Sequence, residues 1–273
     1  MNVFRTLFRL YIHGSIHVAF AVLSLLLMTL HIFQLPFDAP IAAYVFFGTI
    51  GGYNFVKYED YFRSKKHITT ELKVITAISI VALLLSGWAF LLLARITQIT
   101  CIVFFVLTLL YTVPLFPRRK NMRNWTGIKI YMVALCWAGI TVLLPLQNAG
   151  MPVVLVDVAL KCAQRFIFVI ILILIFEIID SKEDDPLLMT VPQKIGIKYT
   201  QWLNIGLLLL FYILTFFKTA ISTKELVINF VLVVVTALFT VFATPNRSKY
   251  YTLFWVESIP IFWLLLVLLA SAY

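Results

Sequence analysis

The chain of 273 residues is 62% hydrophobic and 12% charged, and its mean hydropathy is +1.00. A soluble domain has about a quarter charged residues, so this composition excludes an ordinary soluble protein. The formal net charge of +10 could suggest a nucleic-acid partner, but basic residues in so apolar a chain usually mark cytoplasmic loops. We therefore expect membrane lipids around the protein and no nucleic-acid partner.

Nine apolar segments follow one another along the chain, separated by charged or proline-containing breaks. Several reach the roughly 20 residues that an α-helix needs to cross a bilayer, and the alternating strands of a membrane barrel are absent. We predict an all-α integral membrane protein with nine transmembrane helices. The predicted segments are 14–34, 38–56, 72–94, 97–116, 127–147, 151–179, 202–218, 226–243 and 250–271.

Several of these segments have recognisable helix ends. Asp38 precedes the second segment, and Thr69 or Thr70 precedes the third, where a side-chain oxygen can accept a backbone hydrogen bond. Pro114 and Pro117 end the fourth segment because proline interrupts helical hydrogen bonding.

Lysine and arginine residues lie mainly in alternate breaks between segments. Of 22 basic residues, 17 lie at the N-terminus or in the breaks after the second, fourth, sixth and eighth segments, and 3 lie in the opposite breaks. By the positive-inside rule, we expect the N-terminus and these basic breaks to be cytoplasmic and Tyr273 to lie outside. No small-residue cleavage site follows the first apolar run, so we interpret it as a retained span rather than a signal peptide.

The sixth segment ends in an acidic cluster on the cytoplasmic side. Glu177, Asp180, Glu183, Asp184 and Asp185 are five of the twelve acidic residues in the chain. On a helix, Glu177, Asp180 and Asp184 share one face. Clustered carboxylates repel one another unless a cation lies between them, and such a set suits Mg²⁺ bound together with a phosphate. The alternative is a solvated acidic loop that pairs with nearby lysines.

The residues that begin at Glu177 resemble the second aspartate motif of the UbiA superfamily of intramembrane prenyltransferases. The family pattern is DxxDxxxD followed by T-[LI]-P-x-x-[LIV]-G, and this chain reads EIIDSKED and then TVPQKIG. Glu177 replaces the first aspartate, and the stretch between Asp184 and Thr190 is slightly short. The resemblance implies one UbiA-like domain over residues 1–273, with nine helices around a central cavity and motif loops after helices two and six.

The first motif of the family is degenerate in this chain. Where the family carries NDxxDxxxD, the sequence reads NFVKYEDYF, so that Asn54 matches and Phe55, Tyr58 and Phe62 occupy the aspartate positions. Lys57 lies one helical turn from Asn54 and could hold a phosphate oxygen directly. The alternative is that Lys57 only follows the positive-inside rule.

The break between the fourth and fifth segments reads YTVPLFPRRK from Tyr111 and resembles the family loop that grips the diphosphate. An ordinary basic cytoplasmic loop is the alternative. The resemblance assigns catalysis to Asp180, Asp184 and Tyr111, and Mg²⁺ binding to Glu177, Asp180 and Asp184. Together with the argument for Lys57, it predicts diphosphate binding by Asn54, Lys57, Arg118, Arg119 and Lys120.

Four charged residues lie inside the predicted membrane spans. Each charge at the membrane centre costs about 2.5–3.5 kcal/mol on the insertion scale, so we expect Asp157, Lys161, Arg165 and Glu257 to face the bundle interior. Asp157 can pair with Lys161 one turn away. Arg165 needs a partner on another helix, and Glu257 is a candidate.

The resemblance implies that the protein transfers an isoprenyl group from a prenyl diphosphate to a lipophilic acceptor with the help of Mg²⁺. Two alternatives stay open. One is a UbiA-type terpene cyclase or prenyl diphosphate hydrolase. The other is a non-catalytic isoprenoid- or lipid-binding membrane protein that has lost its first metal site.

Overall fold

A computed structural model of the protein describes residues 3–63, 69–112, 128–184 and 188–272, and the regular elements in these ranges are all helical. The first half of the chain contains α1 (Val3–His13), α2 (Ile16–Ile32), α3 (Ala39–Arg63), α4 (Thr70–Leu91), α5 (Arg95–Thr112), α6 (Ile128–Ala138), the π-helix η2 (Gly139–Leu143) and α7 (Leu144–Ala149). The second half contains α8 (Leu155–Asp180), α9 (Val191–Ile195), α10 (Ile197–Ile213), the 3-10 helix η4 (Leu214–Phe217), α11 (Thr223–Val241), the π-helix η5 (Tyr251–Val256) and α12 (Ile259–Ala272).

Within the described residues, each of the nine predicted apolar segments overlaps at least one helix, and the predicted all-α membrane architecture is confirmed. Among the described residues, seven helices are long and apolar enough to cross a membrane. An eighth span results if α1 and α2, which are bent by 53° at their junction, act as one. Because α5 is apolar but shorter, length and hydropathy support seven or eight spans, and the predicted count of nine is not confirmed.

Large apolar side chains cover the outer faces of the bundle. On α4, for example, Leu84 is 69% exposed and Trp88 is 68% exposed. A soluble protein rarely exposes contiguous apolar surface of this extent, whereas a lipid-facing helix needs it because its backbone groups are satisfied internally. The exposed side chains therefore agree with a multi-pass membrane protein.

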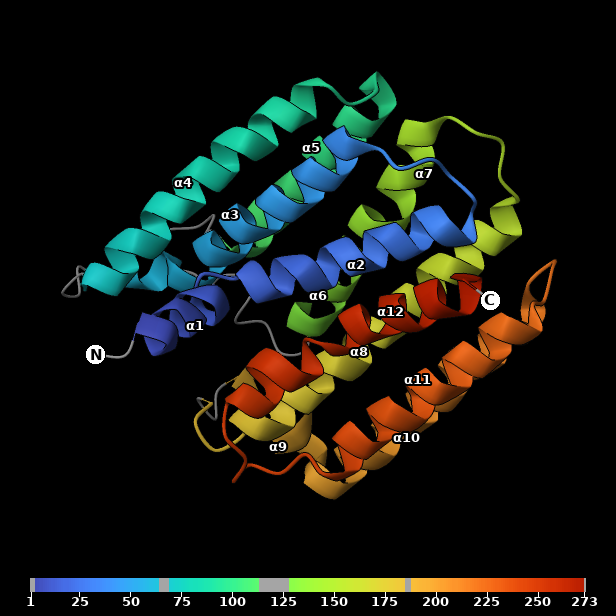
Figure 1. The fold of residues 1–273 in the computed structure, drawn as a ribbon. Coiled ribbons are helices and arrows are strands. Elements are labelled where there is room, and N and C mark those ends of the chain that lie inside the picture. The colour runs from blue at the N-terminus through green and yellow to red at the C-terminus, as the bar shows by residue number, and fades with distance from the viewer. Residues whose placement is uncertain (1–2, 64–68, 113–127, 185–187, 273) are drawn as a thin grey trace.

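The helices form two antiparallel pairs on either side of a central group (Figure 1). The α3–α4 pair lies on one side, the α10–α11 pair lies on the other, and α2, α8 and α12 lie between them. The core between α8, α10 and α12 is aromatic: the ring centroid of Trp263 lies 5.1 Å from that of Phe168 and 5.6 Å from that of Phe211. This packing makes α8, whose C-terminal end carries the acidic cluster, a central helix of the bundle.

Two predicted helix ends are confirmed. The backbone N–H of Ile41 donates to Oδ1 of Asp38 at 3.2 Å at the start of α3, and the N–H of Leu72 donates to Oγ1 of Thr69 at 3.3 Å at the start of α4. The predicted stop at Pro114 and Pro117 lies outside the described residues.

The break between α1 and α2 was not predicted from the sequence. Ser15 has a left-handed backbone with φ of 59°. A Cβ atom at Gly14 would lie 2.5 Å from the carbonyl oxygen of Leu10, so glycine alone fits there without a backbone shift. The break leaves polar backbone groups that other helices must satisfy.

Candidate functional site

A cavity of about 340 Å³ brings charged side chains from three parts of the chain together. We call it the charged cavity. Its charged lining residues are Lys57 of α3, Glu177 and Asp180 of α8, Asp184 just beyond α8, and Glu257 between η5 and α12. The predicted convergence of Glu177, Asp180 and Asp184 is therefore present in the structure.

Glu177 holds the segment after α8 against the helix end. Its side chain is only 6% exposed, and its Oε2 accepts the backbone N–H of Val191 at 3.0 Å. Val191 begins α9, where the N–H of Thr190 donates to Oε1 of Gln193 at 3.0 Å in a capping box. Glu177 thus has a structural partner that sequence spacing did not reveal.

Glu183 lies away from the charged cavity, on the surface of the protein. It forms an ion pair of 2.5 Å with Lys249, and both side chains are more than half exposed. This hydrogen bond raises the pKa of the Lys249 ammonium above its ordinary value. The alternative reading of the acidic cluster as a lysine-paired loop therefore fits Glu183, whereas Asp185 lies outside the described residues.

The remaining two acids fit a magnesium ion that is shared with a phosphate. Among the described residues, no group of three or more His, Cys, Asp and Glu side chains is arranged to hold a metal ion alone. Mg²⁺, however, usually keeps several waters and binds one or two carboxylates together with substrate phosphates. Asp180 and Asp184 offer such oxygen donors on one cavity, so the donor set suits Mg²⁺ that arrives with a diphosphate.

Asn54 of α3 forms hydrogen bonds with the residues at the break between α1 and α2. Asn54 is 3% exposed; its Nδ2 donates to the carbonyl of Gly14 at 3.0 Å and to Oγ of Ser79 at 2.9 Å. Its Oδ1 accepts the hydroxyl of Ser15 at 2.6 Å. Asn54 is not among the residues that line the charged cavity, and its role as a diphosphate ligand stays a prediction. In the structure its amide is occupied by groups at the helix break and by Ser79.

Lys57 reaches both the helix break and the charged cavity. Its Nζ donates to the carbonyl of His13 at 3.3 Å, and the hydroxyl of Tyr58 donates to the same oxygen at 2.9 Å. Lys57 is half-buried and lines the charged cavity with the three acids of the α8 end. An ammonium group with a single long hydrogen bond keeps donors for an anion in that cavity.

The third group of predicted ligands lies largely outside the described residues. Arg118, Arg119 and Lys120 fall between the described ranges, so their predicted role stays a prediction. The backbone of Tyr111 belongs to the last turn of α5, while its side chain is not described.

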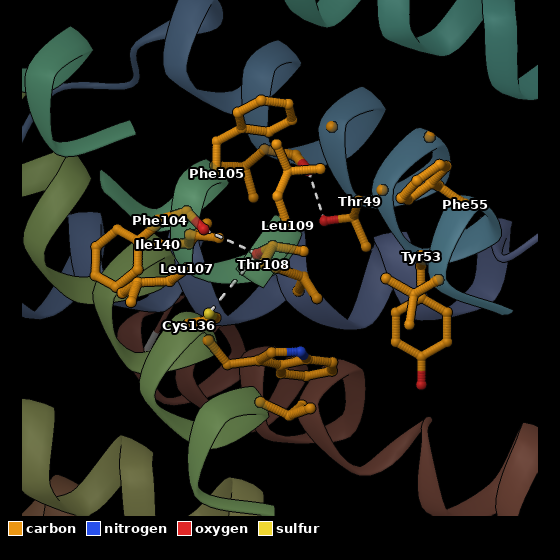
Figure 2. A pocket seen from close by; sticks show the side chains of 18 of the residues that line it. Thr49, Tyr53, Phe55, Phe104, Phe105, Leu107, Thr108, Leu109, Cys136 and Ile140 are labelled. Carbon is orange, nitrogen blue, oxygen red and sulfur yellow. Dashed lines mark hydrogen bonds between the residues drawn. The ribbon is translucent and has the colours of Figure 1, made fainter. Parts of the chain in front are cut away.

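A second cavity, of about 460 Å³, is almost entirely apolar. We call it the apolar cavity. Figure 2 shows Phe104, Phe105, Leu107 and Leu109 of α5 around it, together with Ile140 of η2. Its two threonine hydroxyls are satisfied by backbone carbonyls: Thr49 donates to Val45 at 2.7 Å and Thr108 donates to Phe104 at 2.8 Å. The lining therefore suits a hydrocarbon.

The two cavities share part of their walls. Tyr53 and Val56 of α3 and Val133 and Trp137 of α6 line both. One amphiphilic molecule could thus place a charged group beside Lys57 and an apolar chain among the rings of α5. Cavities of this size, apolar with a few placed polar groups, are typical of small-molecule sites.

The intramembrane charges are placed differently from the expectation. Asp157 does not pair with Lys161; it accepts hydrogen bonds from the backbone N–H of Thr219, at 3.0 Å, and from the Thr219 hydroxyl. Lys161 is 1% exposed, and its Nζ has no hydrogen-bond partner among the described residues. It lies 5.0 Å from the ring centroid of Trp263, where a cation–π contact replaces the expected ion pair.

Arg165 and Glu257 do not form the expected ion pair. Nη2 of Arg165 donates to the carbonyl of Leu25 at 3.1 Å, and its guanidinium lies 5.4 Å from the ring centroid of Trp263. Glu257 instead lines the charged cavity. The pairing was wrong because one-dimensional spacing does not indicate which face of α12 meets α8.

The comparisons with known proteins identify the fold. No protein-family model matches the sequence, and no curated protein matches it significantly. A solved structure of a UbiA homologue from Archaeoglobus fulgidus, bound to GPP and Mg²⁺, superposes with a TM-score of 0.62 at 14% sequence identity. The match covers 97% of this chain and 99% of that one. Together with the motif-like segment that begins at Glu177, it shows that this chain has the UbiA fold.

Proposed function

We propose that this protein is a UbiA-type prenyltransferase that moves an isoprenyl group from a prenyl diphosphate to a lipophilic acceptor. The observation that carries the proposal is a pair of neighbouring cavities that share wall residues. A prenyl diphosphate has a charged head and an apolar chain, and the charged cavity and the apolar cavity offer matching surroundings for each part. The solved UbiA homologue with GPP and Mg²⁺ supports the same ligand class.

In this proposal the diphosphate lies between Lys57 and the α8 end. Asp180 and Asp184 would bind the Mg²⁺ ion that accompanies the diphosphate. The Lys57 ammonium would bind a phosphate oxygen directly. The family resemblance assigns further positive charge to Arg118, Arg119 and Lys120, which lie outside the described residues. When bound, Mg²⁺ supplies Lewis-acid stabilisation of the departing diphosphate.

The proposal places this site at the cytoplasmic face. The basic residues around Lys57 and Arg118 belong to the breaks that the positive-inside rule assigns to the cytoplasm. A water-soluble diphosphate head would then enter from the cytoplasm, whereas the prenyl chain and the lipophilic acceptor would lie within the membrane.

The degenerate first motif supports a second candidate function. Phe55 stands where the family has an aspartate and lines the apolar cavity, and Tyr58 at another such position binds the carbonyl of His13. These positions therefore carry no carboxylate for a first metal ion. This observation favours an isoprenoid-binding protein without transferase activity, or a cyclase or hydrolase that works with one metal site.

The test is to mix purified protein with geranyl, farnesyl or geranylgeranyl diphosphate, with and without Mg²⁺, and to measure binding and diphosphate release. Release that needs an added lipophilic acceptor, such as a long-chain phenol, is the expected result. Release without an acceptor would instead indicate a cyclase or hydrolase. Binding without release would indicate an isoprenoid-binding protein, and no binding at any chain length would reject the proposal.

Two variants test the assigned ligands. Asp180→Asn and Asp184→Asn should each weaken Mg²⁺-dependent diphosphate binding at least tenfold, because each removes a charged oxygen donor. A tenfold loss of affinity corresponds to about 1.4 kcal/mol of binding free energy. Glu183→Gln is the matched control, since Glu183 pairs with Lys249 outside the cavity. Lys57→Ala should weaken diphosphate binding more than Lys249→Ala. Equal effects of the two lysine variants would remove Lys57 from the site.

A further inference from the structure

Glu257 is a carboxylate on the charged cavity that neither the family-like motifs nor the metal assignment uses. It comes from the junction of η5 and α12, far in sequence from the acids of α8. Over the residues that the structure describes, its carboxylate forms no hydrogen bond and no ion pair, and its only hydrogen bond is from its backbone N–H to Thr252 at 3.1 Å. Lys57 on the same cavity attracts this carboxylate electrostatically, but a buried carboxylate that accepts no hydrogen bond is still costly unless it has a function.

The other carboxylates of the charged cavity already have assignments. Glu177 accepts the N–H of Val191, and Asp180 and Asp184 are the proposed partners of the metal-bound diphosphate. Lys57 is cationic and cannot accept a proton while it binds phosphate. Glu257 is therefore the carboxylate of this cavity that is left to accept a proton.

We propose that Glu257 is the proton acceptor of the transfer reaction, an inference that rests on the proposed function. The bond between C1 of the prenyl chain and the diphosphate oxygen breaks, and its electron pair leaves with the diphosphate. The acceptor forms a new bond to C1 and loses the proton of its O–H or C–H group. This proton passes to the Glu257 carboxylate and then to water, so that atoms and charges balance.

The backbone around Glu257 holds the carboxylate in place. The π-helix η5 ends at Val256, directly before Glu257, and the i to i−5 hydrogen bond from the Glu257 N–H to the Thr252 carbonyl belongs to this irregular turn. Insertions of this kind shift the register of a helix and recur at functional sites. The turn is fixed from outside as well, because Nε2 of His17 lies 2.9 Å from the carbonyl oxygen of Phe254, and Ser258 contacts the same imidazole at 3.1 Å.

The first experiment separates binding from chemistry. We expect Glu257→Gln to lower kcat at least 100-fold, the usual size of general acid–base catalysis, while the Kd for geranyl diphosphate with Mg²⁺ changes less than threefold. Glu257→Asp should recover part of kcat because it keeps a carboxylate, on a side chain that is shorter by one methylene group. Glu183→Gln should keep full activity. Unchanged kcat in Glu257→Gln, or a parallel loss of affinity, would overturn the proton-acceptor role.

The second experiment uses the unmodified protein and does not depend on folding of a variant. Dicyclohexylcarbodiimide reacts with the protonated form of carboxyl groups in apolar surroundings, and peptide mass spectrometry locates the adduct. We expect labelling of Glu257 that increases as the pH falls, because the proton acceptor is then protonated, and that geranyl diphosphate with Mg²⁺ suppresses. Labelling that the ligand does not affect, or no labelling of Glu257, would overturn the inference. Failure of the wild-type protein to bind any prenyl diphosphate would instead reject the proposed function itself.

Discussion

Asn54 illustrates how one polar side chain can be committed to architecture at a position where a sequence motif suggests ligand binding. Its amide joins α3 to the α1–α2 break through Gly14 and Ser15, and to α4 through Ser79. A buried amide with all these partners cannot turn toward a ligand without leaving polar groups unsatisfied. The asparagine that this chain shares with the family motif therefore joins α3 to the helix break and to α4.

We predict that Asn54→Ala lowers the free energy of unfolding by about 1–3 kcal/mol, because it leaves the Ser15 hydroxyl and the Gly14 carbonyl without their buried partner. Thermal unfolding in detergent would measure the change, with the exposed Asn246 replaced by alanine as the control. Unchanged stability together with lost diphosphate binding would contradict the structural role and restore Asn54 as a ligand.

At the scale of the helix, the two π-helices coincide with the two cavities. η2 includes Ile140 on the wall of the apolar cavity, and η5 ends at Val256, directly before Glu257 on the charged cavity. Within η2, Gly139 lies directly against the ring of Phe104, because a Cβ atom there would come within 1.8 Å of the ring. Glycine at this position lets α5 and η2 approach closely enough to form the cavity wall.

Gly139→Ala should therefore push the Phe104 ring and reduce the apolar cavity. We expect a loss of about 1–3 kcal/mol of stability, the usual cost of overpacking, and a weaker affinity for long prenyl chains than for geranyl diphosphate. Gly87→Ala on α4 is the matched control, since a Cβ atom there meets nothing within 4 Å and alanine favours a helix. Equal melting temperatures and chain-length preferences for both variants would contradict this account of η2.

The elements themselves were largely predictable from the sequence. Hydropathy located the nine helical segments, Asp38 and Thr69 marked helix starts, and helical periodicity placed Asp180 and Asp184 on one face. These are local properties. The position of Glu257 depended on contacts between distant helices, for which a single sequence has no local signal. Pro260, three residues later, indicated an irregular helix but could not show which cavity the acid faces.

The whole molecule has its two ends at opposite ends of the bundle (Figure 1). Ser271 near the end of α12 contacts His31 at the end of α2, with an Oγ to Nε2 distance of 2.8 Å. α1 adjoins the other end of α2, roughly 25 Å away at 1.5 Å per residue. This placement fits an odd number of crossings, in agreement with the charge alternation between the breaks.

We therefore predict that the N-terminus is cytoplasmic and the C-terminus is outside. An alkaline phosphatase fused after residue 273 should be active, because this enzyme becomes active only outside the cytoplasm. A green fluorescent protein at the same place should stay dark, because it becomes fluorescent only inside the cytoplasm. The same reporters at the N-terminus should give the reverse result. Reporters that place both termini on one side would require an even number of spans.

The wall that Tyr53, Val56, Val133 and Trp137 contribute to both cavities also imposes a direction on any guest. A molecule with a charge at one end cannot turn around inside, because its hydrocarbon would then lie among carboxylates and its phosphates among phenyl rings. A guest that occupied both cavities would therefore lie in one orientation, with its charged end beside Lys57 and its hydrocarbon chain among the rings of α5. In the proposed transfer, the prenylated product would lack the charged end that holds the substrate in the charged cavity, so it would leave into the lipid more easily than the substrate.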